Sequence, residues 1–282
     1  MIVDTLPLLV FGGPYANLQA AMAMRAHADR LGLPVSNVIC TGDVVAYAAA
    51  PEETAQFIRA WGIAVVAGNC EEQLAEGAGD CGCGFAEGSV CDRLSRGWYP
   101  YALGRTSAAS RVWMAGLPAR IDIRYAGLNI CLLHGGAREN NRFLFASERA
   151  RLESEFSAAC REKSCDVVLA GHAGIPFIAP LQDGYWVNAG VIGMPANDGT
   201  PDGWFSLIQR IDGNVRVELR RLSYDHTAAA ADMRRAGHAN GYARTLVTGI
   251  WPSHDVLPEA EHSATGIALP ELTKRLLLPA AV

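Results

Sequence analysis

The stretch Val38-Ile39-Cys40-Thr41-Gly42-Asp43 is an apolar run that ends in a glycine and a carboxylate. Three more apolar runs end in a polar side chain next to a glycine: Gly68-Asn69-Cys70-Glu71, Leu133-His134-Gly135 and Ala170-Gly171-His172. If each run is a strand, one shared edge receives a carboxylate, an amide oxygen and two imidazoles, from Asp43, Asn69, His134 and His172. This mixed set of oxygen and nitrogen ligands suits a divalent first-row metal ion.

The composition is that of an ordinary globular protein. The chain has 282 residues, of which 50% are hydrophobic and 19% are charged. This length predicts one main domain over residues 1–225, followed by a C-terminal helix and extended tail over residues 226–282. The net charge of −5 gives no reason to expect a nucleic-acid partner, and no apolar run approaches the ~20 residues that span a bilayer. The N-terminal sequence lacks the pattern of a signal peptide, so we expect a cytoplasmic protein and leave homo-oligomerisation open.

The first part of the chain alternates strand-like and helix-like stretches. Short apolar runs at residues 7–11, 38–41 and 63–67 predict strands, and the stretches 16–30 and 51–61 between them have helical spacing. The second of these helices begins at Pro51 with two acidic residues in its first turn, where the helix dipole favours them. This βαβαβ order predicts a parallel sheet with right-handed crossovers.

The second part of the chain turns to mixed or antiparallel sheet. Residues 120–125 and 129–134 form a predicted hairpin, and a charged helix over 147–163 leads into the strand 167–170. Further hairpin turns are expected at Asp183-Gly184 and Asp212-Gly213, before a helix over residues 227–236. Residues 76–101, rich in glycine and cysteine, are interpreted as an ordered insertion loop near the sheet edge.

The ordered motifs Gly-Asp, Gly-Asn-x-Glu, His-Gly and Gly-His resemble those of the calcineurin-like metallophosphoesterase superfamily. The motifs most resemble those of the small bacterial phosphodiesterase and diadenosine-tetraphosphatase-like branch. The motif Asn-Pro-Gly-Ser-Val-Gly-x-Pro of that branch is similar to residues 187–195. The resemblance covers about residues 8–226. It implies an α/β fold, a four-layer αββα sandwich of two mixed β-sheets flanked by helices.

The same resemblance implies a metal centre that keeps only one of the family's two sites. Asp43 would bridge the two metals, and Asn69, His134 and His172 would complete the second site. At the first site, the positions of the family's ligands hold Gly13, Tyr15 and Gly174. We therefore expect one divalent ion per chain (Mn²⁺, Fe²⁺ or Zn²⁺), and we refer to Gly13, Tyr15 and Gly174 as the first-metal position.

With one ion, other groups must bind the phosphoryl oxygens that a second ion would hold. The candidates are the N–H groups of the Gly12-Gly13 turn, the Tyr15 hydroxyl, and Arg138 or Arg142. Of the two arginines, Arg138 is assigned a catalytic role. The other residues assigned a catalytic role are Asp43, Asn69, Cys70 and His134. Cys70 stands where many family members have a histidine that protonates the leaving group. Glu71 could replace that acid only if burial raised its pKa, and otherwise it begins the following helix.

The remaining cysteines and histidines leave several alternatives open. Cys81, Cys83 and Cys91, with Cys70, could hold a structural zinc, form a redox-sensitive pair, pack as small side chains or reach towards the first-metal position. Trp98, Tyr99 and Tyr101 are expected to anchor the insertion to the core. The other histidines of the second half are assigned no role: His226, His238, His254 and His262.

The first functional hypothesis is a cytoplasmic metal-dependent phosphoesterase that hydrolyses a small phosphodiester or phosphoanhydride through an activated water. The alternative is an inactive binding or scaffold protein on the same fold, or a sensor. The altered first-metal position favours the alternative, whereas retention of a whole second site favours the enzyme. A third hypothesis is a thiol-based redox or metal sensor built on the four clustered cysteines.

Overall fold

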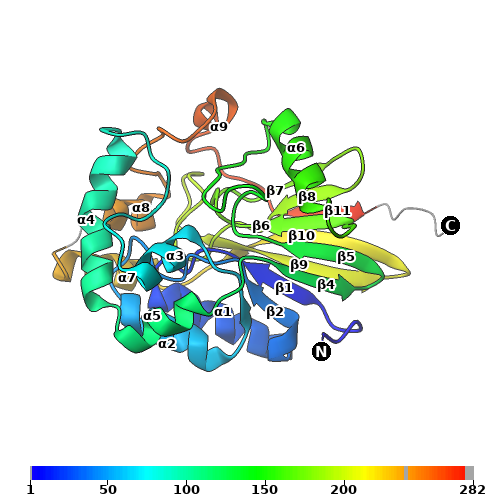
Figure 1. The fold of residues 1–282 in the computed structure, drawn as a ribbon, viewed down its shortest axis with the longest axis horizontal. Helices are drawn as coiled ribbons and strands as arrows, with labels where there is room; N and C mark the ends of the chain where they lie inside the picture. Colours follow the sequence, from blue (N-terminus) through cyan, green and yellow to red (C-terminus); the bar gives the residue numbers. More distant parts are fainter. Residues whose placement is uncertain (1, 238–240, 277–282) are drawn as a thin grey trace.

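Two β-sheets form the centre of the protein, seen in the computed structural model, which describes residues 2–237 and 241–276 (Figure 1). Within these residues, the first sheet has the strand order β11-β10-β9-β1-β2-β3 and the second has β4-β5-β6-β8-β7. The strands of the first sheet are β1 (Leu8–Phe11), β2 (Val38–Cys40), β3 (Ala64–Val65), β9 (Gly203–Ile211), β10 (Asn214–Leu222) and β11 (Leu272–Leu276). Those of the second are β4 (Ile121–Tyr125), β5 (Leu128–Leu132), β6 (Val167–Ala170), β7 (Phe177–Pro180) and β8 (Tyr185–Asn188).

The sheets pack face to face and helices cover their outer faces. A central core joins Leu8, Val10 and Ile39 of the first sheet to Leu132 and Leu169 of the second. A second core lies under α1 (Leu18–Arg30), α2 (Pro51–Trp61) and α7 (His226–Arg235), and a third lies under α6 (Arg149–Ala159). In Figure 1, α6 lies on one side of the sheets and α1 and α2 on the other. The predicted four-layer αββα sandwich of two mixed sheets is confirmed.

The two helices predicted in the first part of the chain are confirmed, with α1 beginning at Leu18 and α2 spanning Pro51–Trp61. The Asn17 side chain accepts a hydrogen bond from the Ala20 N–H at the start of α1. Pro51 occupies the first turn of α2, and Gly62 ends this helix in the left-handed conformation with a φ of 75°. Within residues 2–237 and 241–276, no helix combines the length and the apolar character needed to cross a bilayer.

The predicted strand pairings are confirmed. β1, β2 and β3 are parallel, as the βαβαβ order requires. The hairpins β4–β5, β7–β8 and β9–β10 are antiparallel and turn where the glycine signals lie. Parallel pairing of β5 with β6 and of β6 with β8 makes the second sheet mixed.

The interpretation of residues 76–101 as a loop is wrong for its second half. Residues from Val90 onward form α4 (Val90–Arg105), which begins after Ser89, whose hydroxyl accepts a hydrogen bond from the Asp92 N–H. Pro100 lies inside this helix, and a proline there normally indicates a helix end. A further short helix, α5 (Ala108–Ala115), follows before β4.

The extended tail expected after α7 is also wrong. This part of the chain forms α8 (Tyr242–Thr248), α9 (Glu259–Ser263) and strand β11, which pairs with β10. Arg221 of β10 holds this segment in place, because its guanidinium donates to Asp198 Oδ2 and to the Leu269 carbonyl, each at 2.6 Å. The Leu269 N–H donates to the same carboxylate at 3.1 Å. His238 and residues 277–282 lie outside the described residues.

Replacing Arg221 should destabilise the protein, because the Asp198 carboxylate is buried and would lose its charged partner. We expect Arg221→Ala to lower the free energy of unfolding by about 3 kcal/mol, measured by urea denaturation. Arg216→Ala on the same strand, which removes none of these contacts, is the control and should change stability by less than about 0.5 kcal/mol. Equal losses in the two variants would contradict this role of Arg221.

Candidate metal centre

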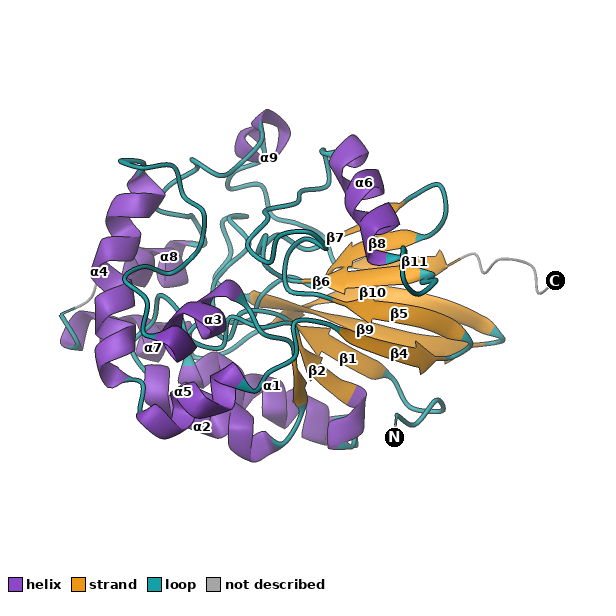
Figure 2. Ribbon diagram, in the orientation of Figure 1, coloured by secondary structure: helices purple, strands orange, loops and turns teal. Residues whose placement is uncertain are grey.

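Side chains from four chain segments meet where strands of the two sheets end. Asp43 follows β2, His134 follows β5 and His172 follows β6, while Asn69 begins α3 (Asn69–Glu76) after β3. The loops that carry these residues gather at one end of the strands (Figure 2). Among the described residues, only Asp43, His134 and His172 place three histidine, cysteine or carboxylate ligand atoms within 4.8 Å of one another. The structure therefore brings together all four predicted metal ligands.

The four ligand atoms converge on one point. His134 Nε2 lies 2.8 Å from His172 Nδ1, 3.1 Å from Asn69 Oδ1 and 3.3 Å from Asp43 Oδ2. His172 Nδ1 lies 3.7 Å from the same carboxylate oxygen. Two imidazole nitrogens that face each other this closely need a proton or a cation between them. The residues present thus fit a divalent metal ion in both donor type and placement.

Neighbouring groups orient each ligand towards that point. His134 Nδ1 donates to the Thr41 carbonyl at 2.7 Å, which leaves Nε2 as the nitrogen that can bind a metal. The Asn69 amide nitrogen donates to the Cys81 carbonyl at 2.8 Å, which turns the amide oxygen towards the histidines. The Cys70 N–H donates to Asp43 Oδ1 at 3.2 Å, and Oδ2 then faces both imidazoles.

Glu71 holds the loop that carries Asp43. Its carboxylate is fully buried and accepts hydrogen bonds from the N–H groups of Asp43 at 2.7 Å and Val44 at 2.8 Å. It also accepts from the Val45 N–H at 3.4 Å and from the Gly68 N–H at 2.9 Å. Asp43 itself has a φ of 52°, a conformation rare for a residue with a side chain. The Glu71 hydrogen bonds stabilise this conformation.

Two glycines permit the close approach of these loops. A Cβ atom on Gly68 would lie 2.3 Å from Asp43 Oδ1, and one on Gly42 would lie 2.6 Å from the Gly68 nitrogen. Gly42 also has a φ of 97°, which favours glycine. The Gly-Asp and Gly-Asn motifs therefore need their glycines because a side chain would separate the two ligand loops.

Burial and mutual contact shift the pKa values of the charged groups. Burial opposes ionisation of Asp43, but His134 and His172 outweigh it and hold its pKa well below the usual range. Burial lowers the pKa of His134, yet Asp43 raises it by more, whereas burial dominates at His172 and lowers its pKa. Burial, followed by the Asp43 charge, raises the pKa of Glu71 to about 7 despite the N–H donors.

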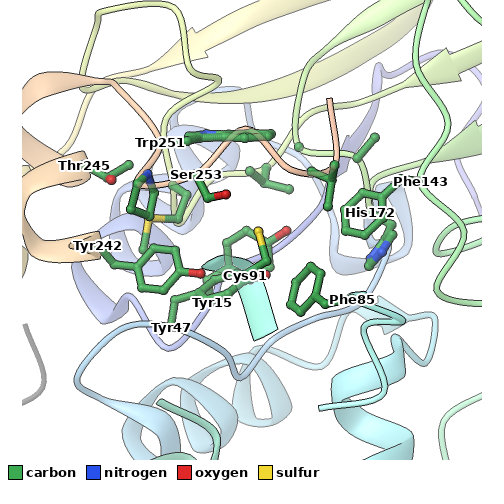
Figure 3. Close-up of a pocket in the computed structure, with 16 residues that line it drawn as sticks. Tyr15, Tyr47, Phe85, Cys91, Phe143, His172, Tyr242, Thr245, Trp251 and Ser253 are labelled. Carbon is green, nitrogen blue, oxygen red and sulfur yellow. The ribbon is translucent and has the colours of Figure 1, made fainter. Parts of the chain in front are cut away.

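Aromatic side chains occupy the first-metal position. The ring of Tyr15 lies over Gly13, where a Cβ atom would be 2.5 Å from Tyr15 Cζ. At Gly174, a Cβ atom would be 3.2 Å from Cζ2 of Trp251. Tyr15, Gly174 and Trp251 line a pocket that also contains His172 (Figure 3). The three altered residues are thus accompanied by a rebuilt, largely aromatic environment.

The structure does not present two of the groups considered for binding phosphoryl oxygens. The Gly12 and Gly13 N–H groups donate to the backbone carbonyls of Gly190 and Gly42, each at 3.0 Å, so they are not available to an anion. Arg138 pairs with Glu155 at 2.8 Å and lines a different depression on the surface. Arg142 instead lines a small depression together with His134 and His172.

Cys70 lies beside Asp43, but its thiol does not have the properties of a proton donor. Burial, followed by the Asp43 charge, raises the pKa of the Cys70 thiol well above its usual value, so the group stays protonated. Disulfide bonds join Cys81 to Cys83 and Cys160 to Cys165. Cys81 and Cys83 do not converge with Cys91 on one point within the described chain, so the structural-zinc alternative is not supported. Their loop instead contacts Asn69, whose amide nitrogen lies 3.4 Å from Cys83 Sγ.

Several residues near the site were not predicted from the sequence. Tyr47, Tyr242 and Trp251 line the pocket beside His172, and the last two come from the segment interpreted as a tail. Trp251 and Tyr242 have no motif around them that marks a site. The expected anchoring role of Trp98, Tyr99 and Tyr101 is confirmed: Trp98 and Tyr99 of α4 are buried in the core, and the Tyr101 hydroxyl donates to the Ala49 carbonyl at 2.8 Å.

Comparison with known proteins agrees with this geometry. A family model described as the calcineurin-like phosphoesterase superfamily domain matches residues 16–208. A metallophosphoesterase from Sphaerobacter thermophilus is similar in structure, with a TM-score of 0.68 and 20% identity over 88% of this chain and 100% of that one. A hypothetical protein from Pyrococcus horikoshii OT3 has a TM-score of 0.71 and 16% identity over 86% of this chain and 98% of the other. At these identities the likeness shows the fold alone. No curated protein matches the chain.

Glu71→Gln should damage the metal centre without removing a ligand. Both Glu71 oxygens accept backbone N–H groups, so either orientation of a glutamine amide points its NH₂ group at a donor. We expect the free energy of unfolding to fall by about 2–3 kcal/mol and Mn²⁺ affinity, measured by calorimetry, to fall roughly tenfold. Glu72→Gln is the matched control, because Glu72 accepts a hydrogen bond from the Asn140 side chain rather than from this loop. Unchanged stability and affinity in Glu71→Gln would show that the carboxylate does not hold the loop.

Proposed function

Because the chain belongs to the calcineurin-like phosphoesterase superfamily, we propose that it is a metal-dependent phosphoesterase with one catalytic divalent ion. The observation that carries the proposal is the convergence of Asp43, Asn69, His134 and His172 on one point. This ligand set suits Mn²⁺, Fe²⁺ or Zn²⁺. A purely structural cluster would have no need for four buried polar groups whose lone pairs face each other.

The residues of the site would have different roles in the reaction. A bound divalent ion supplies Lewis-acid polarisation of a phosphoryl oxygen and lowers the pKa of a coordinated water. Asp43 and Asn69 contribute oxygen ligands, and the Glu71 and Cys81 contacts hold those oxygens in place. His134, with Nδ1 bonded to Thr41, presents Nε2 in one tautomer only.

Arg142 is the residue we propose to bind the phosphoryl group, in place of Arg138. It lines the depression that contains His134 and His172, and its buried Nε lies 3.8 Å from Glu155 Oε1 without making a hydrogen bond to any described residue. Its terminal nitrogen pairs with Glu139 at 2.6 Å, which holds the guanidinium at this edge. A guanidinium here can bind an equatorial phosphoryl oxygen and offset the charge that a second ion would neutralise.

Among the described residues, no proton donor is free beside the ligands: burial raises the pKa of Glu71 to about 7, but both of its oxygens accept backbone N–H groups, and this limits the substrates. Cys70 is a buried neutral thiol with a raised pKa, which makes it a poor proton donor. The proposed substrates are therefore small phosphodiesters of acidic alcohols, or phosphoanhydrides, whose leaving groups need little protonation. A cytoplasmic location and the small bacterial phosphodiesterase-like branch are part of this proposal.

The competing function is a binding or scaffold protein that has lost catalysis. Aromatic filling of the first-metal position favours it, because Tyr15 and Trp251 exclude a second ion of the family's type. Such a protein would keep its fold without needing a metal. The two functions therefore differ in whether Asp43 is required for metal content and for hydrolysis.

Asp43→Ala should abolish both metal binding and hydrolysis. For the wild type we expect about one equivalent of metal per chain by elemental analysis, and metal-dependent hydrolysis of bis(4-nitrophenyl) phosphate. For the variant we expect no bound metal and a rate at least about a hundredfold lower. Asp80→Ala, in the loop before Cys81, is the control for the loss of one aspartate and should retain both. A wild type that binds no Mn²⁺, Fe²⁺ or Zn²⁺ would favour the scaffold function.

Arg142→Gln should impair hydrolysis while leaving the metal in place. We expect kcat/KM to fall roughly a hundredfold, as for the loss of one transition-state donor, with metal content unchanged. Arg138→Gln is the matched control, and its kcat/KM should fall less than about threefold, because Arg138 lines a different depression that contains none of the predicted metal ligands. The reverse order of effects would restore the original assignment of Arg138.

A further inference from the structure

An aromatic-lined pocket opens directly beside the metal ligands. We define the aromatic pocket by Tyr15, Tyr47, Tyr242, Trp251, Phe85 and Phe143, with His172 at one wall (Figure 3). Building on the proposed function, we propose that this pocket binds a planar aromatic group of the substrate, an aryl ring or a nucleobase, whose phosphate lies at the metal ligands. The first-metal position has thereby become a specificity pocket.

The pocket is adjacent to the ligands because His172 belongs to both. Its Nδ1 faces Asp43 and His134, while the other face of the ring packs on Phe143 with ring centroids 4.2 Å apart. A group held in the pocket is therefore one side chain away from the metal. In a phosphate ester one oxygen separates phosphorus from the first carbon of the alcohol, so a ring on that alcohol would lie on the pocket side of His172.

The floor of the pocket is a set of aromatic rings packed edge-on or tilted against one another. The ring of Tyr47 packs edge-on against Tyr15 at 4.8 Å and against Trp98 at 4.9 Å, and it contacts Tyr242 at 4.6 Å. All of these side chains are buried or nearly so. Contacts on several sides fix the ring of Tyr47, so the floor is formed before a ligand arrives.

The opposite wall is equally well held. The Trp251 N–H donates to Asn197 Oδ1 at 2.8 Å, and its indole Nε1–H donates to the Pro195 carbonyl at 2.7 Å. These bonds satisfy the polar atoms of the tryptophan, and its ring faces Gly174. Because Gly174 has no side chain, the indole can lie flat against the backbone and present its other face to the pocket.

The chemistry of the lining favours a flat apolar group over a charged one. No lysine, arginine, aspartate or glutamate lines the aromatic pocket within the described chain. The Thr245 hydroxyl is already bonded to the Ile250 carbonyl at 2.8 Å. Burial raises the pKa of Tyr15, Tyr47 and Tyr242, so these rings stay neutral. Rings of this kind bind another ring through stacking and edge contacts.

The test compares ligands that share a phosphonate or phosphate and differ in the attached group. Metal-loaded protein is titrated calorimetrically with phenylphosphonate and methylphosphonate, and with adenosine 5′-monophosphate and ribose 5-phosphate. We expect the aromatic member of at least one pair to bind about tenfold more tightly, from burial of one ring. The pair that shows the preference identifies the ring as aryl or nucleobase. No preference in either pair would overturn the proposal.

Two variants, one that opens the aromatic pocket and one that fills it, test whether the preference for aromatic ligands arises there. Trp251→Ala opens one wall, and Val256→Trp fills the pocket at another of its lining residues. Both should reduce the aromatic preference to about twofold or less while leaving metal content and methylphosphonate binding unchanged. Trp251→Phe should restore part of the preference. Trp113→Ala, a tryptophan of α5 outside the pocket, is the matched control and should retain the wild-type preference. A preference that persists in both pocket variants would also overturn the proposal.

Adenosine, which carries no phosphate, separates failure of this proposal from failure of the proposed function. If the protein binds no metal but its tryptophan fluorescence responds to adenosine and Val256→Trp abolishes the response, the phosphoesterase function fails and the pocket stands. If the protein binds metal and hydrolyses diesters without aromatic preference, the pocket proposal fails and the function stands.

Discussion

The hydrogen bonds between the Glu71 carboxylate and the backbone of the Asp43 loop are the constraint on which the site depends. They join the loop after β2 to the start of α3, which fixes Asp43 and Asn69 relative to each other. His134 is fixed to the same loop through the Thr41 carbonyl at 2.7 Å. A buried carboxylate is costly unless it is fully hydrogen-bonded, and here the energy of those bonds is used to hold a strained ligand loop.

Much of the fold and the ligand set could be predicted from the sequence, because both depend on local patterns. Strand ends, glycines and polar residues occur in a fixed order, and parallel strands bring their ends to one edge. The resemblance to the phosphoesterase family added the pairing of the two sheets. The four ligand residues met as expected because each is placed by the strand before it and by an adjacent glycine that allows close approach.

The parts that could not be predicted depend on contacts between distant segments. The glycine- and cysteine-rich composition of residues 76–101 indicated a loop, yet packing of Trp98 and Tyr99 in the core accompanies formation of α4. Trp251 carries no sequence signal, since its role comes from the hydrogen bonds that lay it against Gly174. Arg138 and Arg142 are equivalent in sequence and both pair with Glu155, but only Arg142 lines the depression that contains His134 and His172.

At the first-metal position, the missing metal ligands and the aromatic rings found there belong to one coordinated replacement of ligands by rings. Loss of a ligand at Gly13 makes room for the Tyr15 ring, and loss of a side chain at Gly174 makes room for the Trp251 indole. Reintroducing ligands at those two glycines would therefore collide with both rings, so the replacement is not a simple loss of metal ligands. Aromatic rings that contact each other in a continuous series border this position, which distinguishes it from a site that has only lost its ligands. Under the two proposals made above, Asp43, Asn69, His134 and His172 serve the chemistry, and the aromatic pocket at the first-metal position selects what is bound beside them.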